Sequence, residues 1–106
     1  MTNIESDQLL TALADPTRRQ VLEHLRAGPL SVADIAAQMP VSRPAVSQHL
    51  KVLSDAGLLT VEARGNRRIY AVDVEGLAPL RRWLESFWDD VLKSFAAEVE
   101  NRTPDQ

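Results

Sequence analysis

The chain has 106 residues, the length of one domain, and it contains no cysteine, which excludes disulfides, thiolate zinc sites and cysteine nucleophiles. Hydrophobic residues make up 44% and charged residues 25% of the sequence, as in ordinary globular proteins. The formal net charge is −3, from 12 basic and 15 acidic residues, and taken alone it argues against a nucleic acid as partner. We expect a cytoplasmic protein, because the acidic start lacks the pattern of a signal peptide and no stretch approaches the ~20 apolar residues of a membrane span.

The charge is unevenly distributed along the chain. Residues 15–72 carry eight basic and five acidic side chains, whereas residues 73–106 carry four basic and eight acidic ones. Residues 1–14 add two acidic side chains and no basic one. A modestly basic segment therefore lies between two acidic flanks, and this segment is compatible with a polyanionic partner.

Two helices are predicted before residue 28. Leucines at helical spacing over residues 5–14 indicate the first helix. Asp15 followed by Pro16 is a typical start for the second, because the carboxylate caps the first turn and a proline there needs no N–H donor. Gly28 and Pro29 are expected to end it.

Two further helices are predicted between residues 31 and 57. Ser31, with Asp34 three residues later, is a variant of the capping box and predicts a short third helix. Ser42 opens the fourth helix, where Pro44 is tolerated because it lies in the first turn. Gly57 supplies the left-handed residue that ends it.

A β-hairpin and a long helix are predicted in the second half. Residues 58–64 and 67–73 are rich in strand-forming residues, and Gly65–Asn66 between them is typical of a two-residue turn. The apolar spacing over residues 77–100 predicts a last helix of about 24 residues, about 36 Å long.

The order of these elements predicts a mainly α domain with a β-hairpin wing, a winged helix-turn-helix of the form α-α-α-α-β-β-α. We expect one domain over residues 1–101 and a polar tail over 102–106. Within the domain, residues 15–73 form the reading module, and the helices over 4–14 and 77–100 are expected to dimerise.

The dimer prediction depends on the last helix. Four of the five aromatic residues lie in it, and its apolar stripe is wider than packing against one neighbour needs. An internal core helix is the alternative, but the helix is longer than a small body can cover. The predicted interface residues are Leu9, Leu10, Leu13, Leu80, Trp83, Leu84, Phe87, Trp88, Val91 and Phe95.

Three stretches of the chain resemble the ArsR/SmtB family of bacterial winged-helix repressors: LADPTRRQVLEHL, SVADIAAQMPVSRPAVSQHLKVLSDAGLL and RGNRRIYAV. The resemblance implies dimeric transcriptional regulators that bind an operator in double-stranded DNA, associated with the nucleoid, with the first and last helices as the dimer interface. Many metal-sensing members carry a cysteine pair on the third helix or a histidine–carboxylate set on the last helix. This chain has neither, so the resemblance is to the metal-independent type and we expect no metal site and no cofactor.

The polar face of the fourth helix and the wing are the predicted DNA-binding surface. Arg43 and Gln48 have the donors that read guanine and adenine, and Lys51 is better placed for a phosphate. The basic wing tip suits the DNA backbone or a narrow minor groove. The full predicted set is Ser42, Arg43, Pro44, Ser47, Gln48, His49, Lys51, Arg64, Asn66, Arg67 and Arg68.

Less specific interpretations exist for the same residues. Polar side chains on an amphipathic helix are often only solvated, and edge strands often carry charge to prevent aggregation. His49 is as well explained by packing at the helix edge as by a phosphate contact, and His24 is expected to be structural.

We therefore expect a homodimeric DNA-binding regulator, a repressor of a pseudo-palindromic operator, and not an enzyme. Ser47 and His49 point away from each other on a helix and there is no glycine-rich phosphate loop, so catalysis has little support. Two alternatives remain: a winged-helix module for protein–protein interaction, and a regulator that responds to a small ligand held beside Trp83 and Trp88.

Overall fold

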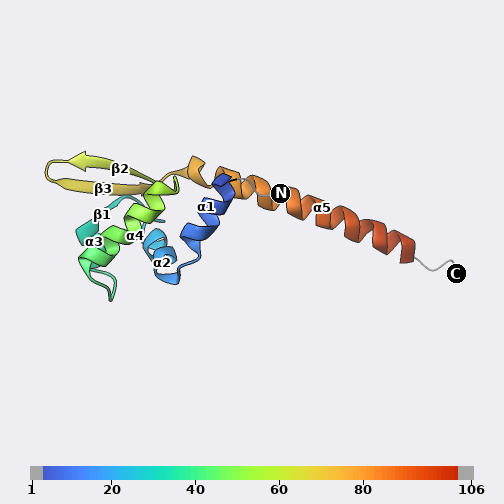
Figure 1. Cartoon of the computed structure of the whole chain (residues 1–106), viewed down its shortest axis with the longest axis horizontal. Helices are drawn as coiled ribbons and strands as arrows, with labels where there is room; N and C mark the ends of the chain where they lie inside the picture. Colours follow the sequence, from blue (N-terminus) through green and yellow to red (C-terminus); the bar gives the residue numbers. More distant parts are fainter. Residues whose placement is uncertain (1–3, 103–106) are drawn as a thin grey trace.

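Helices build the amino-terminal part of the structure, a computed structural model that describes residues 4–102 (Figure 1). They are α1 (Ile4–Leu13), α2 (Pro16–His24), α3 (Val32–Ala36) and α4 (Arg43–Asp55). The Asp15 carboxylate accepts the backbone N–H of Thr17 at 2.7 Å and that of Arg18 at 3.2 Å, which satisfies two free donors at the start of α2. Ser42 caps α4 in the same way, accepting the N–H of Ala45 at 3.2 Å.

The wing is part of a three-stranded antiparallel sheet. It contains β1 (Leu30–Ser31), β2 (Leu59–Arg64) and β3 (Arg67–Val72), in the order β1-β3-β2. Gly65 has a φ of 63°, the left-handed value that the turn between β2 and β3 requires. The hairpin is confirmed, but β1 was not predicted, because two residues are too few to show an alternating pattern.

The core lies between the helices and the inner edge of the sheet. α4 contributes Val46, Leu50 and Leu53, each with 0% of its surface exposed. The other buried apolar residues are Leu9, Ala12, Val21, Leu25, Ile35, Met39, Leu58, Leu59, Tyr70 and Leu80.

The end of α4 is closely packed against the connection to α5. Gly57 ends the helix with a φ of 86°, and its carbonyl oxygen occupies the space that a Cβ on Gly76 would need. Gly76 belongs to η1 (Val74–Leu77), the short 3₁₀ helix that leads into α5. Only glycine fits at this position, since any side chain would collide with backbone.

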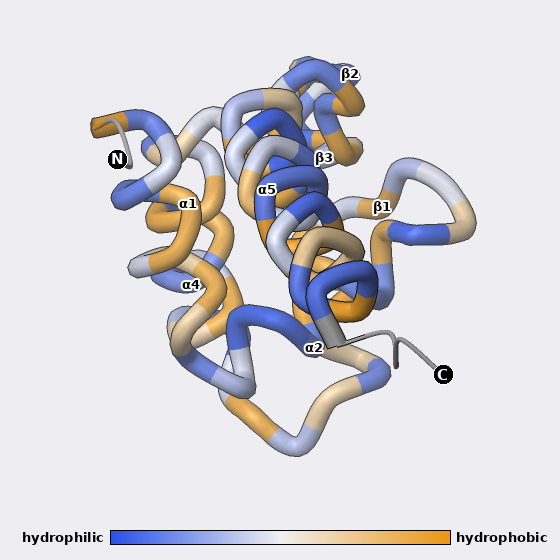
Figure 2. Tube along the Cα trace, turned by 90° about the vertical axis from the view of Figure 1, so that its right-hand side faces the viewer, coloured by the Kyte–Doolittle hydropathy of each residue, from blue (hydrophilic) through white to orange (hydrophobic). Residues whose placement is uncertain are grey.

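The last helix extends far beyond the body. α5 (Ala78–Arg102) has 25 residues, and the described chain measures 72 × 25 × 21 Å. In Figure 1 the β2–β3 ribbon and the far end of α5 lie at opposite ends of the long axis. Figure 2, which views α5 nearly end-on, shows hydrophobic positions along α1, α4 and α5. The helix predicted over residues 77–100 is therefore present, and most of its length lies outside the core.

Candidate nucleic-acid interface

The outer face of α4 carries polar side chains, opposite the face that packs into the core. Arg43, Ser47, Gln48 and Lys51 are all exposed. The helical period separates these residues from Val46 and its buried neighbours, as the sequence predicts. Ser42 and Pro44 are also exposed at the amino end of the helix, where Ser42 already serves as the cap.

The five cations predicted to face DNA differ in their availability. Lys51 Nζ pairs with Asp55 Oδ2 at 3.0 Å on the same helix, and Arg64 pairs with Glu62 at 3.1 Å on the same strand. Within residues 4–102, the side chains of Arg43 and Arg68 form no hydrogen bond or ion pair. These two guanidiniums are therefore free to bind a phosphate or a base edge without breaking an existing contact.

Arg67 differs from Arg68, because its guanidinium has partners within the described residues. Its Nη2 donates to Ser31 Oγ at 2.7 Å and lies 3.3 Å from Asp34 Oδ2. The wing tip is basic in sequence, but two carboxylates lie beside its arginines. Glu62 is close in sequence, whereas Asp34 is brought there only by the fold.

The free cations line one hollow between the wing and the helix-turn-helix. Its volume is about 240 Å³. It is lined by Ser31, Val32, Ala33, Arg43, Asn66, Arg67 and Arg68. The fold therefore brings the amino end of α4 and the wing tip to a common surface. One ligand can contact both elements there.

The two histidines lie away from this hollow. His49 is half-buried on the side of α4 that faces the start of α2. The pKa of the Asp15 carboxyl is lowered, chiefly because the backbone N–H of Arg18 donates to it, and the charges of Arg18 and His49 act in the same direction. His24 is half-buried and lines a separate hollow beside Gly28 and Pro29. Among residues 4–102 there is no group of three histidine, aspartate or glutamate side chains placed to hold a metal ion.

The predicted interface residues divide into buried and exposed groups. Leu9 and Leu80 are buried in the core, and Leu13 and Trp83 pack against it from the edge. The exposed members are Leu10 (44%), Leu84 (50%), Phe87 (55%), Trp88 (60%), Val91 (41%) and Phe95 (63%). Leu92 and Val99, at 46% and 47% exposed, extend the same apolar surface, although neither was in the predicted set.

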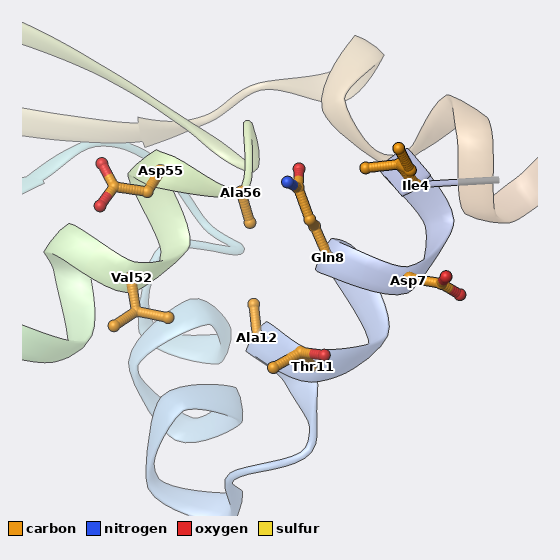
Figure 3. A pocket seen from close by; sticks show the side chains of 8 residues that line it. All are labelled: Ile4, Asp7, Gln8, Thr11, Ala12, Val52, Asp55 and Ala56. Carbon is orange, nitrogen blue, oxygen red and sulfur yellow. The ribbon is translucent and has the colours of Figure 1, made fainter.

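Further hollows lie near α1. One, of about 360 Å³, is a groove between α1 and the end of α4, and its lining includes Ala12, Val52 and Ala56 (Figure 3). Figure 3 shows the carboxylates of Asp7 and Asp55 turned away from its centre.

Another hollow, about 310 Å³, lies along α5 beside Trp83 and Phe87, whose rings stack at 5.5 Å. Trp88, expected beside a ligand there, does not line it.

Comparison with known proteins identifies the family. A model of a helix-turn-helix domain matches residues 13–62. The chain is 48% identical over 99 residues to the HTH-type transcriptional regulator Rv2034 of Mycobacterium tuberculosis, covering 93% of this chain and 92% of that protein. It is 34% identical to the arsenical resistance operon repressor of Staphylococcus xylosus, covering 73% of this chain and 74% of that protein. The chain belongs to the ArsR/SmtB family.

The fold agrees with this membership. The solution structure of a homodimeric winged helix-turn-helix DNA-binding domain from Mycobacterium bovis, a possible ArsR-family regulator, is similar with a TM-score of 0.66. That comparison has 27% sequence identity and covers 85% of this chain and 83% of the other. The protein is thus a DNA-binding transcriptional regulator and not an enzyme.

Within the described residues, no helix is both long and apolar enough to cross a membrane.

Proposed function

We propose that this protein represses transcription by binding a pseudo-palindromic operator as a homodimer and occluding a promoter. The observation that supports this most directly is the surface formed by the amino end of α4 and the wing, where Arg43 and Arg68 have no partner within the described residues. A face with unpaired cations on both elements can contact a base edge in the major groove and the adjacent backbone together.

In this proposal α4 reads sequence and the wing binds backbone. Arg43 and Gln48 pair with base edges in the major groove, and Ser47 contacts a base or a phosphate. Arg68 and Asn66 bind the backbone beside it. Lys51 and Arg64 must break their ion pairs with Asp55 and Glu62 before they can bind a phosphate. They therefore contribute less to the affinity for DNA than the free arginines.

The proposed dimer uses the exposed part of α5 together with α1. A compact chain of this length has a radius of gyration of about 13 Å, whereas this one has 19.3 Å. The excess comes from α5, whose apolar side chains beyond Trp83 are exposed in the single chain. A second copy that covers this stripe places two α4 helices on one DNA duplex, and Leu9 and Leu80 support the interface from inside the body.

Regulation by a thiolate metal site has no support, since the sequence has no cysteine, and we assign the protein to the metal-independent type. For a small effector, the groove between α1 and the end of α4 is the better candidate place, because it joins the proposed dimer helix to the reading helix. Figure 3 shows the Gln8 amide turned toward its centre, and this group alone does not specify a ligand.

The experiment that tests the function is selection of bound fragments from genomic DNA, followed by footprinting of the enriched sequences. We expect protection of two inverted half-sites that overlap a promoter. Recovery of fragments without a protected inverted repeat would refute the proposal.

A further inference from the structure

Arg67 has a different environment from the other wing arginines. Its guanidinium crosses from β3 to the amino end of α3, where Nη2 donates to Ser31 Oγ at 2.7 Å and lies 3.3 Å from Asp34 Oδ2. The contact joins residues that are 36 and 33 positions apart in the sequence. It is the hydrogen-bonded side-chain link between the wing tip and the helix-turn-helix among the described residues.

The two acceptors of Arg67 are held in place by contacts that do not involve the arginine. Ser31 is 3% exposed, and its hydroxyl accepts the backbone N–H of Asp34 at 3.1 Å in a capping box. The pKa of the Asp34 carboxyl is lowered, first by its hydrogen bond with the Ser31 hydroxyl, then by the Ser31 backbone N–H, and further by the charge of Arg67. A preorganised pair of acceptors holds a guanidinium in one geometry better than two mobile side chains do.

The rest of the wing is weakly attached to the body. β1 pairs with β3 through two residue pairs only, Leu30 with Tyr70 and Ser31 with Ile69. From Arg68 to the tip, β3 pairs with β2 alone, and residues 60–64 of β2 are exposed. A two-stranded ribbon without packing is expected to bend and twist freely, so an anchor near its tip determines where the tip lies.

We propose that Arg67 is a positioning residue that ties the wing to the amino end of α3, so that Arg68 and Arg43 face the same stretch of DNA backbone. The inference rests on the proposed function, because it explains how the hollow between wing and α4 keeps its shape. Arg67 also neutralises Asp34, whose carboxylate would otherwise lie bare beside a phosphate-binding surface. Direct phosphate binding is then the task of Arg68, which lines the same hollow and whose guanidinium has no partner within the described residues.

A DNA-free experiment tests the tether alone. Hydrogen exchange of the full-length protein is followed by mass spectrometry in peptides that cover residues 28–34 and 66–72, for wild type, Arg67→Ala and the matched control Arg68→Ala. We expect exchange in both peptides to rise several-fold in Arg67→Ala and to stay at the wild-type rate in Arg68→Ala. Equal rates in all three proteins would overturn the tether, whether or not the protein binds DNA.

A double-mutant cycle tests its consequence on DNA. Affinities of wild type, both single variants and the double variant are measured by fluorescence anisotropy on a duplex that carries the footprinted site. Each single variant is expected to bind about tenfold more weakly. Because Arg67 acts by placing Arg68, the double variant should bind about as weakly as either single variant.

If the two losses multiply to about a hundredfold, Arg67 contacts DNA independently and the inference is wrong. If wild type fails to bind any selected duplex, the proposed function fails, and the exchange experiment still decides the tether.

Discussion

The body and the outer part of α5 have the same amphipathic helical pattern but opposite exposure. Val46, Leu50 and Leu53 of α4 are fully buried, whereas Trp88 and Phe95 of α5 are 60% and 63% exposed. An apolar stripe indicates that a helix has a partner, but it does not tell whether that partner lies in the same chain. The length of α5 supplies this information, because it exceeds what the body can cover.

Truncation of a core residue should give the largest effect. Leu50→Ala removes a fully buried side chain at the centre of the body, and we expect a loss of about 2–5 kcal/mol in the free energy of unfolding. Urea denaturation followed by circular dichroism measures it. Leu92→Ala, on the exposed stripe of α5, is the matched control. An equally large loss of unfolding free energy for this variant in a monomeric preparation would show that the two regions do not differ in burial.

Charge on the α5 stripe should separate the protomers. In the double variant Trp88→Glu with Phe95→Glu, we expect the dimer dissociation constant to rise at least 100-fold, since two large apolar side chains become acidic at the proposed interface. Light scattering after gel filtration gives the mass. Lys93→Glu on the same helix adds acid without removing apolar surface and should remain dimeric. A monomeric wild type at micromolar concentration would contradict the dimer.

The junction between the two regions should tolerate no side chain. Gly76→Ala places a Cβ against the Gly57 carbonyl, and we expect a loss of about 1–3 kcal/mol from the forced shift. Thermal unfolding measures the effect. Gly28→Ala meets no atom within 4 Å but has a φ of 152°, so it controls for backbone strain without a collision. An unchanged melting temperature for Gly76→Ala would show that α4 and the start of α5 are not closely packed.

The smallest effect concerns the cap of α2. The Asp15 carboxyl has a pKa below its usual 3.8, so its stabilisation is present above that value and is lost as the pH falls through the lower folded value. Asp15→Asn keeps a capping acceptor without this titration. We expect wild type to melt at a higher temperature at pH 6 and the two proteins to converge as the pH falls below the lowered pKa of the folded state. If the difference in melting temperature between the two proteins stays constant as the pH is lowered from 6, the carboxylate is not the source of that difference.

Much of the fold follows from local sequence signals. Asp15, Ser31 and Ser42 each cap a helix, as expected, because capping depends on residues within one turn. The outward face of α4 was equally predictable from its period. The contact of Arg67 with Asp34 was not, since it joins residues 33 positions apart.

The α1 prediction shows the same limit. Leu9 and Leu10 are equivalent as apolar residues, but Leu9 is 1% exposed and Leu10 is 44% exposed. Which of two neighbouring leucines is buried depends on which side of α1 packs against the core. The apolar pattern within one short helix does not predict that side. Tertiary contacts likewise decide which cations are free to bind DNA. Arg67 is paired with Asp34, whereas the side chain of Arg68 has no partner within the described residues.

In the proposed function, two rigidly joined copies of the protein read two half-sites of one operator. Insertion of five base pairs between the half-sites of the footprinted duplex turns one of them about half a helical turn away from the other. We predict that the wild-type protein loses at least tenfold in affinity for this duplex in an anisotropy titration, while insertion of ten base pairs restores part of it. Equal affinity for all three duplexes would contradict the account.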